Sequence, residues 1–133
     1  MKISLKQSDS FIPDYEDNLT QPEDEQIKFN YRFLGSGTRK QYEYLEDIQI
    51  TQEIAEGSQQ VGNRKLIQDT KGMALAMVTS IENLEIEYVI DGVKKVEQVT
   101  DIHDFYKRSL PGLAQLLEAH CLSATSEVNP KNS

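Results

Sequence analysis

A strict alternation of apolar and polar side chains over residues 27–33 most constrains what this chain can fold into. The run reads Ile27, Lys28, Phe29, Asn30, Tyr31, Arg32 and Phe33. Successive side chains on a strand point to opposite faces, so this segment buries one face and exposes the other to water. Such half-burial is typical of a strand in an antiparallel sheet. The glycines of Gly35-Ser36-Gly37 then end the strand.

A β-hairpin is predicted over residues 85–99. Apolar residues alternate along its first strand at Ile86, Tyr88 and Ile90. The Asp91-Gly92 pair that follows favours the positive φ angles of a tight hairpin turn. The return strand keeps the alternation imperfectly, which indicates a bulge or a shorter strand.

Four helices are predicted from apolar spacing and capping residues. They run from Thr38 to about Ile50, from about Asp69 to Asn83, from Thr100-Asp101 to about Arg108, and from Ser109 and Pro111 to Ala124. Arg39 and Glu43 are expected to form an i,i+4 ion pair on the first helix. Residues 56–65 hold two glycines and few apolar groups, so a loop is predicted there.

Together these elements predict a single α+β domain. Its small antiparallel sheet is built from the 26–34 strand and the 85–99 hairpin and is packed by three or four helices. The chain divides into an extended acidic N-terminal arm over 1–26, the domain over 27–124, and a flexible C-terminal tail over 125–133. A length of 133 residues suits one such domain.

The negative charge of the chain is concentrated in the arm. The whole chain holds 22 Asp and Glu against 14 Lys and Arg, a net charge of −8. Residues 1–26 hold seven of the acids and only two lysines, a net charge of −5. Pro13 and Pro22 keep the arm extended or looped, and Phe11 is among the apolar residues expected to anchor it to the body or to a partner. Nucleic acid is not an expected partner, because its binding depends on Lys and Arg.

A membrane partner is not expected either. The longest apolar run, Met73 to Val78, has six residues, whereas a helix needs ~20 to span a bilayer. The first residues lack the long apolar core and the cleavage site of a secretory signal. These observations predict a soluble, cytoplasmic protein.

The turn Gly35–Lys40 is the one candidate for phosphate binding. It joins a strand to a helix, where phosphate cradles form, but it lacks the glycine spacing of a Walker loop and of a dinucleotide fingerprint. Two glycines and a Thr38 cap explain the turn without a ligand. A small phosphate-binding enzyme is therefore kept only as an alternative.

Metal and catalytic patterns are weaker still. His120 and Cys121 are neighbours on a helix and diverge by about 100°, so they do not readily chelate one ion, and His103 stands 17 positions away. Cys121 is the one cysteine, which excludes an intrachain disulfide, and it is expected on a buried stripe. No nucleophile motif occurs. The sequence thus predicts no catalytic residue, no cofactor and no metal.

Four segments occur in a recognisable order along the chain. They are Ile12-Pro13 with Leu19-x-x-Pro22-Glu23-Asp24-Glu25-Gln26-Ile27, then Arg39-Lys40-Gln41-Tyr42, then the run 78–86 with Asp91-Gly92 and Val99-Thr100-Asp101, and last Leu110-Pro111-Gly112-Leu113 with Leu122-Ser123-Ala124. In this order the chain resembles small tail proteins of long-tailed bacteriophages and prophages, particularly the tail assembly chaperones encoded before the tape measure protein.

The resemblance implies a non-catalytic role in the host bacterial cytoplasm. Such chaperones bind the long, helical tape measure protein, help recruit tail tube subunits, and are absent from the finished virion. A structural tail or connector component is the alternative within phage biology, and a homo-oligomer is compatible with the family. These chaperones also exist in frameshifted longer forms, and Lys131-Asn132 permits a slippery codon run.

Two apolar stripes are the candidate partner-binding surface. Their members are Met73, Met77 and Ile81, and Leu113, Leu116 and Leu117. Methionine adapts readily to a partner helix, which favours this interpretation. The same stripes also suit the core of a short domain, and burial is expected for most of these residues.

Overall fold

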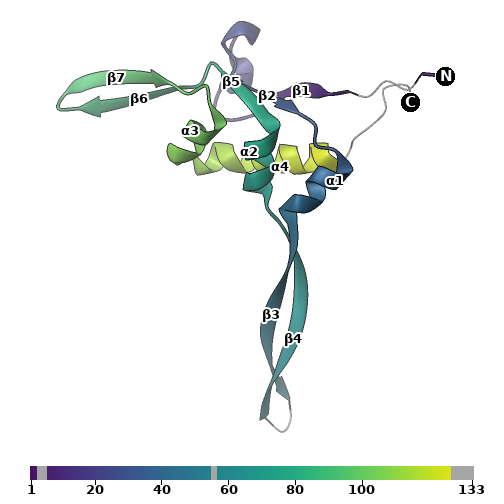
Figure 1. The fold of residues 1–133 in the computed structure, drawn as a ribbon. Coiled ribbons are helices and arrows are strands. Elements are labelled where there is room, and N and C mark those ends of the chain that lie inside the picture. The colour runs from purple at the N-terminus through teal and green to yellow at the C-terminus, as the bar shows by residue number, and fades with distance from the viewer. Residues whose placement is uncertain (3–5, 55–56, 127–133) are drawn as a thin grey trace.

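The strands of this protein form three separate antiparallel sheets. The computed structural model describes the backbone of residues 1–2, 6–54 and 57–126. Within this part, one sheet has the order β1 (Ser8–Phe11), β2 (Lys28–Arg32), β5 (Val78–Glu82), and the other two are the pairs β3 (Glu43–Ile54) with β4 (Gly57–Gln68) and β6 (Glu85–Ile90) with β7 (Val93–Gln98). Figure 1 shows the two pairs as hairpins that project from the body in different directions.

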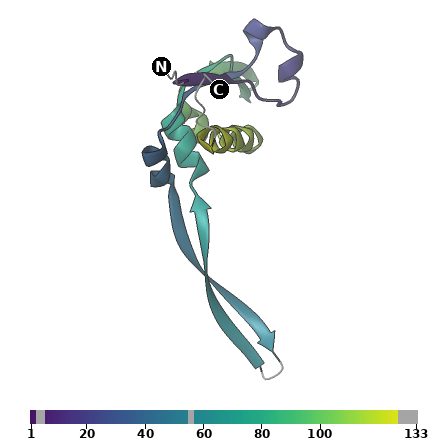
Figure 2. The same cartoon turned by 90° about the vertical axis from the view of Figure 1, so that its right-hand side faces the viewer.

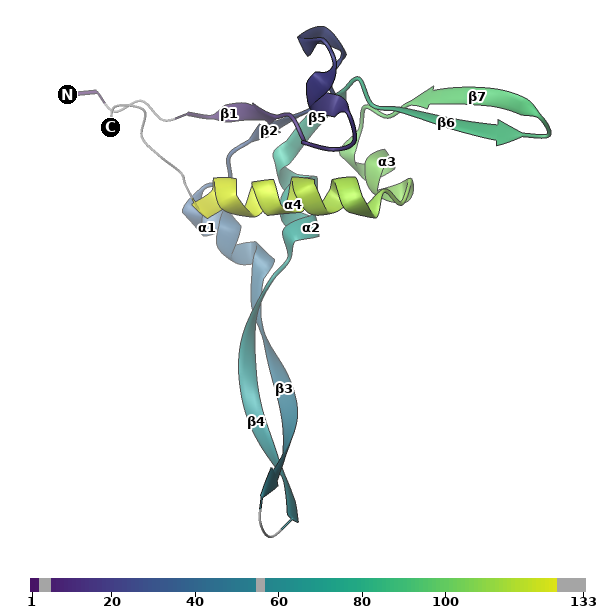
Figure 3. The ribbon, with the colours of Figure 1, turned by 180° about the vertical axis from the view of Figure 1, so that it is seen from behind.

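Three helices in the described part are longer than about one turn. They are α2 (Thr70–Met77), α3 (Ile102–Lys107) and α4 (Pro111–Ser126). The shorter pieces are α1 (Ser36–Arg39) and the 3-10 turns η1 (Asn18–Thr20), η2 (Glu23–Glu25) and η3 (Lys40–Tyr42). Figures 1 and 3 show α4 running below the three-stranded sheet and crossing α2. No helix of the described residues is both long and apolar enough to cross a membrane.

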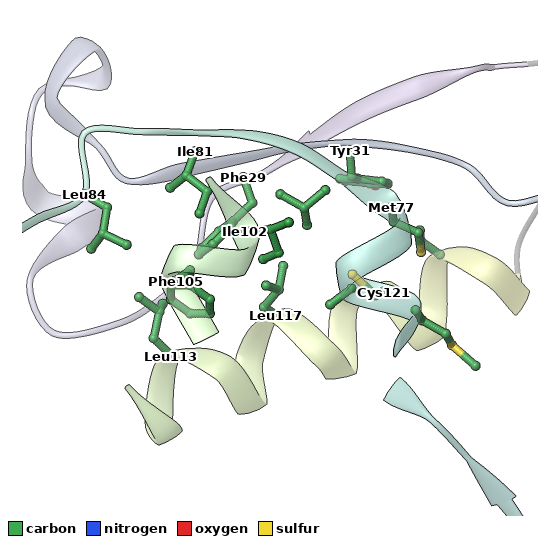
Figure 4. Packing of buried hydrophobic residues seen from close by; sticks show 14 of the residues in the cluster. Phe29, Tyr31, Met77, Ile81, Leu84, Ile102, Phe105, Leu113, Leu117 and Cys121 are labelled. Carbon is green, nitrogen blue, oxygen red and sulfur yellow. The ribbon is translucent and has the colours of Figure 1, made fainter. Parts of the chain in front are cut away.

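The core lies between the three-stranded sheet and the helices α2, α3 and α4. Phe29 of β2 is fully buried and meets Phe105 of α3 edge to face, with 5.4 Å between ring centroids. Tyr31 lies on the same buried face, while Arg32 is exposed, so the predicted alternating, antiparallel strand is confirmed. Figure 4 shows side chains from α2 and α4 closing the other side of this cluster, among them Met77 and Leu117.

The predicted single sheet packed by three or four helices is wrong. Strand β2 pairs with β1 and β5, and the hairpin over 85–99 stands apart as its own two-stranded sheet. The helix predicted to reach Asn83 ends at Met77, because the β-branched residues that follow favour the extended backbone of β5. Strand β5 pairs with β2 in the sheet where the hairpin was expected.

The helix predicted over 38–50 and the loop predicted over 56–65 are also wrong. Both segments belong to one long hairpin, in which β3 and β4 pair residue by residue from Glu43↔Gln68 to Ile54↔Gly57. The apolar residues of this segment fit both patterns: Tyr42, Leu45 and Ile48 are three positions apart, as on a helix face, whereas Ile48 and Ile50 alternate, as on a strand face. Local spacing therefore did not separate the two structures. Figure 2 shows this hairpin twisting as it leaves the body.

The remaining elements match their predictions more closely. The hairpin over 85–99 turns at Asp91 and Gly92, whose φ angles are 51° and 76°. Of the two alternatives expected for its return strand, the bulge is absent, because the β6–β7 ladder keeps one continuous register, and the strand ends at Gln98. Helix α3 begins where expected, and the Asp101 carboxylate caps it by accepting the backbone N–H groups of His103 and Asp104. Helix α4 is confirmed as well.

The N-terminal arm is held onto the body by strand pairing, stacking and one buried side chain. Strand β1 pairs with β2, and the Phe11 ring stacks on His120 of α4 with 4.2 Å between centroids. Asn18 is only 6% exposed. Its amide donates to the carbonyls of Pro13 and Ile27 and accepts the Ile27 N–H, which folds the arm back before β2 begins.

Candidate protein-interaction site

The six residues predicted to bind a partner lie in or beside the core. Five are at most 2% exposed, namely Met73, Met77, Ile81, Leu113 and Leu117. Leu116 is half-buried. The structure therefore brings the two stripes together, but as an internal cluster that this conformation does not offer to a partner.

Exposed apolar side chains gather instead on the two hairpins. At the base of β3–β4, Leu45 pairs with Leu66, and these side chains are 60% and 54% exposed. Tyr44 is also exposed, and it pairs with Ile67 on the opposite face of the ladder. Both faces of this hairpin base therefore present apolar area without cover from the body.

The second hairpin exposes four more large apolar residues, Val89, Ile90, Val93 and Val96. Ile90 pairs directly with Val93 beside the turn. Val89 pairs with Lys94, and Val96 lies two residues after Lys94 on the same face of β7. Val89 and Val96 are therefore diagonal neighbours on the face opposite to Ile90 and Val93. The apolar area of this hairpin is thus divided between its two faces.

A charged cluster ties the base of β6–β7 to α3. The Arg108 guanidinium donates to Glu97 at 2.6 Å and to Asp104 at 3.2 Å, and the Tyr88 hydroxyl also donates to Glu97. The Tyr88 hydrogen bond and then Arg108 lower the pKa of Glu97. This carboxylate therefore stays ionised on the hairpin at neutral pH.

The arm and the start of β6 line an open cleft of about 620 Å³. Four carboxylates face it, from Glu16, Asp17, Glu25 and Glu85. The described part of the chain contains no group of three or more His, Cys, Asp or Glu side chains placed to hold a metal ion. The cleft is thus an acidic surface feature to which the structure assigns no ligand.

The Gly35–Lys40 turn does not have the form expected of a phosphate cradle. Helix α1 that follows it has only four residues, and Thr38 lies inside that helix rather than at its cap. The predicted Arg39–Glu43 ion pair is present at 3.3 Å, although Glu43 already belongs to β3. Because Glu43 competes for the Arg39 charge, these features do not favour an anion site here.

The histidines and the cysteine occupy different environments. His120 is half-buried, and its Nε2 lies 2.9 Å from the Tyr31 hydroxyl. Burial lowers the pKa of His120 and raises the pKa of Cys121 to about 12. Cys121 is buried on α4, as its place on the apolar stripe predicted, while His103 is exposed at the start of α3.

Sequence reasoning missed the two features that now matter most. Leu45 falls within the predicted helix and Leu66 directly after the predicted loop, and only their pairing across the 20 residues between them reveals an exposed apolar pair. Asn18 lay in a segment expected to be extended or looped, and nothing local marks its amide as buried. The local signal for the first feature is weak, because Glu46 interrupts the alternation that Tyr44, Ile48 and Ile50 would otherwise form.

Comparison of the chain with protein-family models, with curated proteins and with solved structures found no match. The resemblance to tail assembly chaperones therefore depends only on the sequence segments quoted above.

Proposed function

We propose that this chain is a non-catalytic phage tail assembly chaperone that binds the tape measure protein in the host cytoplasm and helps recruit tail tube subunits. The observation that carries the proposal is the exposed Leu45–Leu66 pair at the base of a long projecting hairpin. Exposed apolar patches of this kind mark protein-interaction surfaces. The family resemblance supplies the identity of the partner.

The proposed contact surface differs from the six residues of the two predicted stripes. Those residues hold the body together, whereas the hairpins expose apolar side chains that the body does not use. The β3–β4 ladder has no partner strand beyond its own pair among the described residues. Its edges are thus open to main-chain pairing as well as to side-chain contact.

A co-purification experiment tests the chaperone function. The full chain is co-expressed with the tape measure protein from the same genome, and the amount of chain retained with that protein is measured. The double variant Leu45→Ser/Leu66→Ser should reduce the retained amount about tenfold or more. Leu19→Ser is the matched control, because Leu19 is an exposed leucine of the arm. Equal retention of both variants would contradict the assigned surface.

A structural tail or connector component is the second candidate. The two projecting hairpins favour it, because arms that reach beyond a compact body suit permanent contacts between neighbouring subunits. Mass spectrometry of purified mature particles separates the candidates. A chaperone is absent from the particles, and a structural subunit is present in a fixed ratio to the tube protein.

A further inference from the structure

Among the residues that the structure describes, β7 pairs only with β6, so its other edge is unpaired and the residues whose backbone groups face that edge can be identified. The β6–β7 hairpin has a two-residue turn, so Ile90 and Val93 form its first hydrogen-bonded pair. Hydrogen-bonded pairs alternate with non-bonded ones in an antiparallel ladder. The bond from the Val99 N–H to the Leu84 carbonyl, 2.9 Å, follows the same alternation. The backbone groups of Lys94, Val96 and Gln98 therefore point to the unpaired edge.

The charges on β7 change sign along the strand. Lys94 and Lys95 lie in the half near the turn, and Glu97 lies in the half near the body. An antiparallel partner with the same sequence would place the basic half of one strand against the acidic half of the other. The edge is thus complementary in charge to a second copy of itself.

Only one central register satisfies both the hydrogen bonds and the charges. A twofold axis at Val96 pairs Lys94 with Gln98 of the second copy through the outward backbone groups, and it sets Lys95 opposite Glu97. An axis at Lys95 would set that lysine against its own copy. An axis at Glu97 would oppose two glutamates. Like charges directly opposite one another destabilise a strand pair.

We propose that two copies of this chain associate through their β7 edges about a twofold axis at Val96, forming a four-stranded sheet in the order β6–β7–β7–β6. Val96 then packs against Val96 of the second copy, and two Lys95–Glu97 pairs form. Figures 1 and 3 show the β6–β7 hairpin projecting from the body. This association goes beyond the proposed function and does not depend on it.

Glu97 is already fixed in position for such a pair. Its carboxylate is held by Tyr88 and Arg108, so little further side-chain order is lost when a lysine approaches. A carboxylate has about four lone-pair sites, and two donors leave acceptor capacity free. Lys95 is exposed. The contact is small, so the dimer forms in a concentration-dependent way.

Sedimentation equilibrium of the full-length chain tests the proposal. The wild type should pass from monomer to dimer as concentration rises. Lys95→Glu alone sets two glutamates opposite each other, and Glu97→Lys alone sets two lysines opposite each other, so each should weaken the dimer about tenfold or more. An equimolar mixture of the two variants restores both opposite-charge pairs and should dimerise. Lys40→Glu, the same charge change on an exposed residue of η3, is the matched control and should dimerise like the wild type.

Cysteine cross-linking tests the register and remains decisive if Glu97→Lys fails to fold. Val96→Cys should form a disulfide-linked dimer on mild oxidation, since residue 96 faces its own copy at a Cα separation of about 5.5 Å. Lys94→Cys and Gln98→Cys should cross-link with each other in a mixture but not with themselves. The native Cys121 is buried, and the oxidised wild type measures its background.

Three results would overturn the proposal. The first is a wild type that remains monomeric at the highest soluble concentration. The second is a mixture of the folded charge variants that stays as monomeric as each variant alone. The third is equal self-cross-linking at positions 94, 96 and 98, which would show contact without the proposed register.

Discussion

Replacing Asn18 by alanine should destabilise the whole chain by about 2–4 kcal/mol. The substitution removes the acceptor of the Ile27 N–H, 2.7 Å away, and the donor to the Pro13 and Ile27 carbonyls at 2.9 and 3.2 Å. A buried polar group left without a partner costs about 1–3 kcal/mol. Because the bond to Pro13 is fully buried and the bonds to Ile27 are only partly buried, water compensates in part at Ile27, and the sum is smaller than three full penalties.

Urea unfolding followed by circular dichroism measures this change. The midpoint should fall while the slope with denaturant stays constant, because the surface exposed on unfolding is unchanged. The melting temperature should fall by about 4 °C per kcal/mol. Gln26→Ala is the matched control: its amide also donates to two carbonyls of the arm, but both bonds are solvent-exposed, so its cost should stay below about 1 kcal/mol.

The variant Asn18→Asp sharpens the test. It keeps an acceptor for the Ile27 N–H but turns a carboxylate toward two carbonyl oxygens. At pH 7 it should be no more stable than Asn18→Ala. If Asn18→Ala lost no more stability than Gln26→Ala, the assignment of Asn18 as the buried anchor of the arm would be refuted.

Three other outcomes can be checked by standard measurements. Leu117→Ala should cost about 2–5 kcal/mol in urea unfolding and the adjacent, half-buried Leu116→Ala clearly less, so equal losses would contradict the packing of α4. Burial lowers the pKa of His120, so protonation of this histidine favours the unfolded chain. The free energy of unfolding should therefore be highest above pH ~6.5 and should fall as the pH decreases from that value toward the folded-state pKa. His120→Asn should remove this part of the pH dependence of the urea midpoint. Cys121 is buried with its pKa raised to about 12, so an aromatic disulfide reagent at pH 8 should label it only as fast as the chain unfolds, and rapid labelling in native buffer would contradict its burial.

The elements that could be predicted from the sequence are those whose signal is local. Strand β2 alternates strictly, the β6–β7 turn carries Asp91-Gly92, and α3 begins at the Asp101 cap. Each of these features depends on neighbours within a few residues. Local patterns of this kind specify backbone geometry before any tertiary contact forms.

The elements that could not be predicted depend on distant pairing. Strand β4 holds glutamines, an asparagine and glycines that read as a loop, and it is a strand because β3 supplies a full ladder of partners. In the same way, Val78 continues a helical stripe by its spacing but turns into β5 beside β2. Tertiary pairing overrode local preference at both places. For the same reason the candidate interaction surface lies on the exposed hairpins and not on the predicted stripes, which are buried.

The two proposals use different hairpins, and this separation has a consequence for partner binding. Association through β7 leaves the Leu45–Leu66 pair of each copy free, because β3–β4 projects from the body in another direction. A dimer would therefore carry two copies of the apolar hairpin base. Two linked sites on one long helical partner raise the effective local concentration of the second contact, so that avidity exceeds the affinity of either alone. Lys95 lies on β7, outside the β3–β4 hairpin. Lys95→Glu should therefore weaken the retention of the chain by the tape measure protein only through loss of the dimer. Co-expression with a second copy that carries Glu97→Lys should restore both the dimer and the retention.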